Sequence, residues 1–208
     1  MSAAPDRPAV QAVIFDYGMV LSRAQRRADV AAMHRRVGAG ARAFRTAYWR
    51  HRPAYDDGLD ATTYWLRVLR DLRRLDRRDE IDTLIERDVS SWTDYRREAW
   101  QLAARLRRQG RRVGMLSNAV PEIVARIRKD WDLDRCFDDI VLSYEVGLLK
   151  PDPKIYRAAL DRLGVAAEVT LFTDDRAVNV RAAEKVGMRG FVFAGPRPFE
   201  RLKRAIGS

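Results

Sequence analysis

Short apolar stretches alternate with longer amphipathic stretches over most of the chain. Each apolar stretch ends near a polar residue or a glycine, a pattern typical of buried strands. These predicted strands cover residues 10–15, 112–116, 140–143, 169–173 and 190–193. Apolar residues with helical spacing predict helices at 121–129, 153–163, 177–186 and 199–205. The alternation predicts an α/β fold in which a Rossmann-like, doubly wound parallel sheet is joined by right-handed crossovers.

The first predicted strand departs from this rhythm, because about 90 residues separate it from the second. A loop of that length is implausible in a compact domain, and most of the segment has helical spacing. The helical stretches cover residues 24–37, 41–49, 61–75 and 79–90, and another at 95–109 leads back to the sheet. We therefore predict a small helical cap at residues 23–95, inserted into a core made of residues 1–22 and 96–208.

The net charge of +11 is unevenly distributed along the 208 residues. Residues 23–112 hold 23 Lys and Arg against 13 Asp and Glu, so almost the whole excess lies between the first two strands. Solvated helix faces explain these scattered arginines, and since no nucleic-acid motif accompanies them we expect no nucleic-acid partner. The same region contains Trp49, Trp65, Trp92 and Trp100. Their helical spacing favours the core of the cap over a homodimer surface, and a homodimer stays open.

The cysteine content and the hydropathy pattern favour a reducing compartment. The single cysteine, Cys136, cannot form a disulfide within the chain. The N-terminal segment MSAAPDRPAV lacks the basic start and the apolar run of a signal peptide. No stretch reaches the roughly 18 apolar residues of a membrane span. We therefore expect a cytoplasmic protein that does not enter a membrane.

Candidate chemistry begins at the end of the first predicted strand. The run AVIFDYGMVL places Asp16 after an apolar stretch and just before a glycine turn. Three later segments carry further polar residues at strand ends: MLSNA at 115–119, VGLLKPDPKIY at 146–156 and LFTDDRAVNV at 171–180. Ligands of open α/β sheets bind at the carboxyl ends of strands, so we expect these segments to meet at one edge. Together they resemble the haloacid dehalogenase-like (HAD) hydrolase superfamily, most of whose members are magnesium-dependent phosphatases.

The resemblance implies a role for each polar residue of the first three segments. Asp16 resembles the family's nucleophile, which attacks phosphorus and forms an aspartyl-phosphate that water then hydrolyses. Ser117 stands where the family has a phosphate-binding Ser or Thr, and Asn118 beside it is also expected to bind the phosphate. Lys150 would neutralise both the nucleophile and the incoming phosphate. Alone, each of these residues would be explained by turn chemistry or by solvation; their order along the chain favours catalysis.

The fourth segment carries two adjacent acids, Asp174 and Asp175, which would repel each other without a cation nearby. Mg²⁺ resolves this conflict because it prefers oxygen ligands. By resemblance, Asp16, the backbone carbonyl of Gly18 and Asp175 are expected as direct ligands, and Asp174 as a ligand directly or through water. Asn179 is expected to support the loop. A helix N-cap is the structural alternative for the acidic pair.

Position 18 departs from the family pattern. Most phosphatases of the superfamily have a second aspartate there, which serves as general acid and base, whereas this chain has Gly18. A positioned acid or base contributes about 10² to 10⁴ in rate. The Asp-x-Gly-x-Val pattern is similar to that of sugar-1-phosphate phosphatases of the superfamily. Water or one of five side chains could substitute: Asp174, His34, His51, Asp56 or Asp57.

The sequence therefore predicts a magnesium-dependent phosphatase for a small phosphorylated metabolite, such as a sugar phosphate, with activated phosphates preferred over simple alkyl phosphates. A catalytically impaired regulatory or binding protein of the same fold is the alternative that Gly18 supports. The 2-haloacid dehalogenases of the superfamily open on Asp-x-Tyr-Gly-Thr. This chain lacks that pattern, because Tyr17 adjoins Asp16 and Val20 stands in the Thr place, so dehalogenation is disfavoured.

Overall fold

Five parallel strands form a single sheet in the computed structural model, which describes residues 8–207. They are β1 (Ala12–Phe15), β2 (Arg112–Ser117), β3 (Asp139–Leu142), β4 (Thr170–Asp174) and β5 (Arg189–Val192). Their order is β3-β2-β1-β4-β5, so β1 is central. The strands β2 and β3 lie on one side of β1, and β4 and β5 lie on the other. The predicted Rossmann-like, doubly wound α/β fold is confirmed, and each predicted strand lies within two residues of the observed one.

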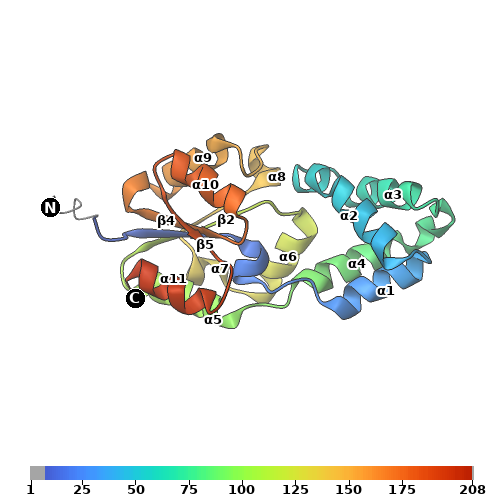
Figure 1. The fold of residues 1–208 in the computed structure, drawn as a ribbon, viewed down its shortest axis with the longest axis horizontal. Coiled ribbons are helices and arrows are strands. Elements are labelled where there is room, and N and C mark those ends of the chain that lie inside the picture. The colour runs from blue at the N-terminus through green and yellow to red at the C-terminus, as the bar shows by residue number, and fades with distance from the viewer. Residues whose placement is uncertain (1–7, 208) are drawn as a thin grey trace.

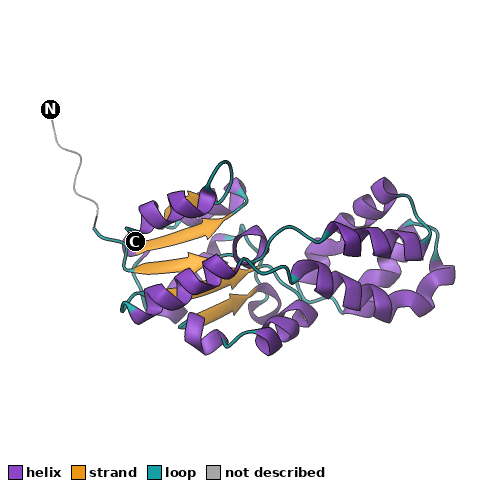
Figure 2. Cartoon of the chain, turned by 90° about the horizontal axis from the view of Figure 1, so that it is seen from below, coloured by secondary structure: helices purple, strands orange, loops and turns teal. Residues whose placement is uncertain are grey.

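Helices cover both faces of the sheet (Figures 1 and 2). One face carries α9 (Pro153–Leu163) and α10 (Ala177–Lys185), and the other carries α5 (Arg97–Arg108), α6 (Pro121–Asp130), α7 (Leu133–Cys136) and α11 (Pro198–Ile206). Strand β1 serves both layers because its side chains alternate. Ala12 and Ile14 pack with the α9 layer, whereas Val13 and Phe15 pack with the α5 layer. All four are at most 1% exposed.

Local sequence signals account for where several of these helices begin and end. Proline occupies the first turn of α6, α9 and α11, where its missing N–H costs nothing. The α9 helix also starts at the Asp152 carboxylate, which accepts the Lys154 N–H, and ends at Gly164 in the left-handed conformation. No helix within residues 8–207 combines the length and the hydropathy that crossing a membrane requires.

Four further helices lie beyond the carboxyl ends of the strands (Figure 1). They are α1 (Arg27–Val37), α2 (Ala41–Asp56), α3 (Ala61–Asp71) and α4 (Ile81–Trp92), with a short helical turn, η2 (Leu75–Glu80), before the last. Helix α2 continues seven residues past its predicted end, through Pro53, because Arg52 and Tyr55 are buried on its inner face. Helix α3 ends at Asp71, four residues before its predicted end.

Aromatic side chains fill the centre of this four-helix layer. Tyr64 and Trp65 of α3 are fully buried, and Phe44 of α2 stacks on Trp65 with ring centroids 6.2 Å apart. Trp100 of α5 is also fully buried. The burial expected from helical spacing therefore holds for Trp65 and Trp100, whereas Trp49 of α2 is 44% exposed.

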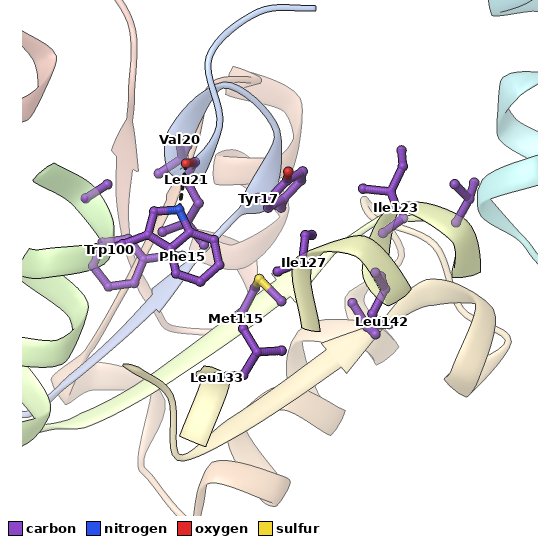
Figure 3. Packing of buried hydrophobic residues seen from close by; sticks show 14 of the residues in the cluster. Phe15, Tyr17, Val20, Leu21, Trp100, Met115, Ile123, Ile127, Leu133 and Leu142 are labelled. Carbon is purple, nitrogen blue, oxygen red and sulfur yellow. Dashed lines mark hydrogen bonds between the residues drawn. The ribbon is translucent and has the colours of Figure 1, made fainter. Parts of the chain in front are cut away.

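The two chain segments that connect the helical layer to the sheet are paired. Ser22 forms an antiparallel bridge with Tyr95, and the Arg23 N–H donates to the Asp94 carbonyl at 2.7 Å. Just before this bridge, the Trp100 indole N–H donates to the Leu21 carbonyl at 2.9 Å (Figure 3). We propose that this paired junction separates the core, residues 1–22 and 96–208, from the cap, residues 23–95.

The same substitution can be compared at a buried valine, Val13, and at an exposed one, Val178. Val13 lies in the central strand at 0% exposure, and Val178 lies on α10 at 40% exposure. Val13→Ala leaves a cavity and is expected to lower the free energy of unfolding by about 2 kcal/mol, whereas Val178→Ala changes it by less than about 0.5 kcal/mol. Chemical denaturation of both variants measures the difference. Equal losses would contradict the placement of β1 at the centre of the core.

Candidate active site

The polar residues that follow three of the strands converge at one edge of the sheet. Asp16 directly follows β1, while Ser117 is the last residue of β2 and Asp174 the last residue of β4. The parallel register pairs Phe15 with both Met115 and Thr173, so these three strand ends lie at similar heights. Lys150 reaches the same edge from the loop between α8 (Ser143–Val146) and α9.

The Lys150 ammonium is the centre of this arrangement. Its Nζ lies 2.7 Å from Asp16 Oδ1 and 2.8 Å from Asp174 Oδ2, and it donates to the Leu116 carbonyl at 3.1 Å. These three acceptors use all three of its N–H groups. Lys150 is only 4% exposed, so the contacts are shielded from water and fix the position of the Asp16 carboxylate.

Three carboxylates share this single buried ammonium. Asp16, Asp174 and Asp175 each offer an oxygen, and these oxygens lie within 4.8 Å of one another. Burial and the Asp174 charge raise the pKa of Asp16 to about 7 against the opposing effect of Lys150, and burial together with Asp174 also raises the pKa of Asp175. Burial is the largest cause of both raised pKa values, and repulsion among the three carboxylates, which outnumber the ammonium, adds an excess of negative charge. A metal ion fits here, because a divalent cation would balance that charge with oxygen ligands.

Asp174 is the most constrained of the three acids. Its Oδ2 accepts from Lys150 and from the Asn179 amide at 2.9 Å, while its Oδ1 accepts the Arg176 N–H at 2.8 Å. Burial acts to raise the pKa of Asp174, but Lys150 and these hydrogen bonds outweigh it and lower that pKa. Asp174 is therefore held as a carboxylate that positions the lysine, which makes it a poor proton donor. Asn179 Oδ1 is buried and has no hydrogen-bond partner among the residues that the structure describes.

Ser117 and Asn118 lie beside Lys150 and have different environments. The Asn118 side chain accepts the Lys150 N–H at 2.9 Å and donates to the Lys150 carbonyl at 3.1 Å. This reciprocal pair anchors the lysine loop to the end of β2. Within residues 8–207, the buried Ser117 hydroxyl has only a long contact, 3.4 Å, to the Asn118 carbonyl. Ser117 is thus free to turn its hydroxyl toward a ligand in the adjoining cavity.

The turn after Asp16 leaves room at position 18. Gly18 has φ −60° and ψ 131°, angles that any residue adopts, and a Cβ built there would lie 3.9 Å from both Asp16 Oδ2 and Trp92. The next residue, Met19, has φ 61°, which is strained for a side chain of this size. Position 18 therefore has room for an acidic side chain. The next residue, the strained Met19, places a methionine side chain at the cavity.

A cavity of about 630 Å³ connects these residues with the cap. Helices α1 and α2 line its outer part, and the ends of β1, β2 and β4 line its base. Of the side chains predicted as substitute acids, His34 and Asp56 line the cavity, whereas His51 pairs with Asp71 and Asp57 is exposed outside it.

A buried polar network of the cap also borders the cavity and was not predicted from the sequence. The Tyr48 hydroxyl donates to Asp88 at 2.7 Å and accepts from Arg52 and from the Trp92 indole. Arg52 in turn donates to Asp56 at 2.7 Å. Phe44, Tyr48, Arg52 and Asp56 are four residues apart, which places them on one helix face. That spacing was visible in the sequence, but nothing in it indicates that this face borders a ligand cavity.

A protein-family model for haloacid dehalogenase-like hydrolases matches residues 6–187. The chain belongs to the haloacid dehalogenase-like hydrolase family. The resemblance noted in the four motif segments is thereby confirmed. The match also spans the four cap helices, so it includes the region that lacks a recognisable motif.

Curated relatives of this HAD hydrolase carry names from two reaction classes. A phosphoserine phosphatase of Thermus thermophilus is 36% identical over 49% of this chain, and a phosphatase of Mycobacterium tuberculosis is 33% identical over 53%. The matched regions span only 41% and 52% of those relatives. A (S)-2-haloacid dehalogenase of Burkholderia cepacia is 31% identical over 86% of this chain and 80% of its own length.

Solved structures share the fold over nearly the whole chain. A HAD family enzyme of Bacteroides thetaiotaomicron, in a complex with magnesium and inorganic phosphate, superposes with a TM-score of 0.74 at 18% identity, covering 93% of this chain and 99% of its own. A dehalogenase superposes with a TM-score of 0.70 at 23% identity, covering 96% of this chain and 98% of its own. These similarities establish the common fold.

Removing one carboxylate of the cluster is expected to weaken magnesium binding. Asp175→Asn removes a charged oxygen ligand while keeping the size of the side chain, so the Kd for Mg²⁺ is expected to rise at least about tenfold. Isothermal titration calorimetry of the native chain and the variant measures this change. Asp57→Asn, an exposed acid outside the cluster, is the matched control and is expected to bind as the native chain does. Unchanged affinity in Asp175→Asn would contradict the site.

Proposed function

We propose that the chain is a magnesium-dependent phosphatase that hydrolyses a small phosphorylated metabolite through an aspartyl-phosphate on Asp16. The observation that carries the proposal is the Lys150 ammonium clamped between Asp16 and Asp174 beneath a cavity. This contact holds the Asp16 carboxylate in place and offsets part of its charge. A phosphate entering the cavity therefore meets a fixed nucleophile and a cation.

Asp16 is the nucleophile in this mechanism. Its Oδ1 accepts from the Tyr17 N–H and faces Lys150, whereas Oδ2 has no hydrogen-bond partner within residues 8–207. Oδ2 attacks phosphorus in line, the bond from phosphorus to the substrate alcohol breaks, and the alcohol leaves. Water then attacks the phosphorus of the acyl phosphate, which releases inorganic phosphate and restores the Asp16 carboxylate.

The polar residues around Asp16 bind the substrate phosphate or hold the groups that bind it. The Ser117 hydroxyl binds a phosphate oxygen, and Lys150 neutralises charge on the phosphate as well as on Asp16. Asn118 and Asn179 position other side chains of the site. Asn118 anchors the Lys150 loop, and Asn179 donates to the Asp174 carboxylate. We assign Asn118 to positioning, since both polar groups of its side chain are engaged with the Lys150 backbone.

Four groups of this chain would hold the magnesium ion. They are the carboxylates of Asp16, Asp174 and Asp175 and the backbone carbonyl of Gly18. A bound Mg²⁺ screens the phosphate charge during transfer. Without it, the excess negative charge of the three carboxylates would repel a phosphate dianion from the nucleophile.

The absence of a general acid at position 18 restricts the leaving group. The pKa of Asp174 is lowered, and position 18, where a Cβ would lie 3.9 Å from Asp16 Oδ2, carries no side chain. An alcohol that leaves without protonation by the protein must have a lowered pKa or take its proton from water. Activated phosphates are therefore expected to react faster than alkyl phosphates with the same hydrocarbon body.

The relatives named as phosphatases support this reaction class. Besides the two bacterial phosphatases, a sesquiterpene phosphatase of Aspergillus oryzae is 37% identical over 43% of this chain. It matches 45% of its own length. The matched parts of these relatives cover about half of this chain, so substrate identity has to come from the cavity itself.

A second candidate function is 2-haloacid dehalogenation, which the long match to the Burkholderia cepacia enzyme favours. There Asp16 would attack carbon and displace a halide, and water would hydrolyse the resulting ester. A 2-haloacid carries its own carboxylate and the reaction uses no metal, so that carboxylate would meet three acids close to Asp16 Oδ2, while Lys150, Arg52 and Arg176 also line the cavity. The cluster of three carboxylates favours the phosphatase, because a bound metal would balance it.

Product analysis with and without magnesium distinguishes the two reactions. The native chain is expected to release inorganic phosphate from p-nitrophenyl phosphate and acetyl phosphate with Mg²⁺, and at least about 100-fold less with EDTA. Asp16→Asn keeps the shape of the side chain but removes the nucleophile, so release is expected to fall at least about 10³-fold. Halide release from 2-chloropropionate is expected to be absent. Metal-independent halide release would establish the dehalogenase instead. If folded protein releases neither phosphate nor halide, the result would favour a binding protein.

Gly18→Asp tests whether the missing acid limits the reaction. The backbone angles and the free space accept the side chain. We expect kcat/KM for an alkyl phosphate to rise at least about tenfold, because the alcohol is then protonated as it leaves. Acetyl phosphate, whose leaving group needs no proton, is expected to change less than about threefold. Gly18→Asn is the control of equal size without the proton, and an equal gain in Gly18→Asn would show that acid catalysis is not the cause.

A further inference from the structure

The outer part of the cavity is walled by apolar side chains. On α1 these are Val30, Ala31 and Met33, and on α2 they are Phe44 and Trp49. Met19, Trp92 and Ile123 extend the apolar wall toward Asp16. A sugar ring would bury its hydroxyl groups against such surfaces without partners, which is costly, whereas a hydrocarbon would gain from the same burial.

The cavity is also elongated. Ala41 at the first residue of α2 and Asp56 at its last residue both line it. Fifteen residues of helix correspond to about 22 Å of rise. The Asp56 end adjoins the core, since the Asp56 carbonyl accepts from the Ser143 hydroxyl, and the Ala41 end lies at the opposite end of the helix. A long substrate body therefore fits along α2 with its phosphate at Asp16.

Two large apolar side chains of this cavity are exposed, and covering them would be favourable. The large hydrophobic residues that are exposed among those the structure describes are Met19, Trp49, Leu75 and Val178. Two of them, Met19 at 37% and Trp49 at 44%, line the cavity. The strained backbone at Met19 indicates that its placement there has a cost that folding alone does not explain. An apolar ligand would cover both side chains.

Several polar side chains of the α2 wall are partnered by one another. Arg52 bonds to Tyr48, Asp56 and Asp88, and Tyr48 also donates to Asp88. These side chains have little capacity left to recognise hydroxyl groups, whereas Gln25 and His34 also line the outer cavity. The charged residues Arg27 and Arg45 are exposed at the rim, where they attract an anion without selecting its body.

We propose that the substrate is the monophosphate ester of an elongated apolar alcohol, such as a fatty or prenyl alcohol, whose hydrocarbon lies between α1 and α2. This assignment rests on the proposed phosphatase function and names its substrate class. It revises the sugar phosphate that the first motif alone favours, because the cavity walls select the body of the substrate and the motif does not.

A series of n-alkyl phosphates from ethyl to decyl, used below micelle-forming concentrations, tests the assignment with one leaving-group chemistry throughout. Each buried methylene is expected to raise kcat/KM by up to about fourfold, so decyl phosphate should exceed ethyl phosphate by at least about 100-fold. Decyl phosphate is also expected to exceed glucose 1-phosphate, although the sugar is the better leaving group. A flat series, with phosphate release still dependent on Asp16, would overturn this assignment and leave the proposed function standing.

Binding of phosphonates that are not hydrolysed tests the apolar substrate site separately from the phosphatase reaction. Decylphosphonate, which cannot be hydrolysed, is expected to bind at least about 100-fold more tightly than ethylphosphonate. Trp49 and Trp92 line the cavity, so intrinsic fluorescence reports the titration. If no phosphate ester is hydrolysed but decylphosphonate binds selectively, the proposed function fails and the apolar site stands. Equal binding of the two phosphonates would overturn the site itself.

Two adjacent alanines of α1 supply matched variants. Ala31 lines the cavity and Ala32 does not, yet both are half-buried in the same helix. Ala31→Asp places a charge against the hydrocarbon, so the ratio of decyl to ethyl phosphate turnover is expected to fall at least about tenfold. Ala32→Asp carries the same helix-propensity cost and is expected to keep the native ratio. Circular dichroism verifies that both variants are folded, and equal ratios in the two would contradict the proposed path of the substrate.

Discussion

The buried ammonium of Lys150 is the interaction on which the site depends. It lies between two carboxylates and a strand-end carbonyl, so it ties the loop before α9 to the ends of β1, β2 and β4. Because a buried charge is tolerated only when it is paired, each of these elements has to deliver its partner to within hydrogen-bond distance. The same contact leaves the carboxylates in excess, and that excess makes the site suited to a divalent cation, which in the proposed reaction would screen the phosphate charge.

The chemistry near Asp16 and the selectivity of the cap are connected through position 18 and its neighbour. In the proposed reaction, Gly18 supplies no acid to protonate the leaving alcohol, while Met19, in a strained conformation, adds apolar surface beside it. The turn thus presents a methionine side chain and no acid beside Asp16, the proposed nucleophile. This arrangement agrees with the apolar walls of α1 and α2 and with the proposed hydrocarbon body of the substrate.

Most of the core could be predicted because its signals are local. The β1 strand is apolar at every position and buried on both faces, and Pro121 and Pro153 begin helices that the periodicity also indicates. The prediction was weaker in the cap. Helix α2 continues through Pro53 because burial of Arg52 and Tyr55 stabilises that turn, and a local rule that treats proline as a helix end cannot include this tertiary contribution.

The sequence alone determined the family, the order of the strands along the chain and the identity of Asp16, Ser117, Asp174 and Asp175 as residues at strand ends, because strand periodicity and motif spacing are properties of neighbouring residues. Lys150, which the sequence also singled out, reaches the same edge from the loop between α8 and α9. Only the tertiary structure decided what these residues contact. It showed that Asn118 anchors the lysine loop, that His51 and Asp57 lie away from the cavity, and that Met19 and Trp49 face it. Such relations join segments up to about 160 residues apart, and their distances are fixed by packing of the whole chain, which no local pattern encodes.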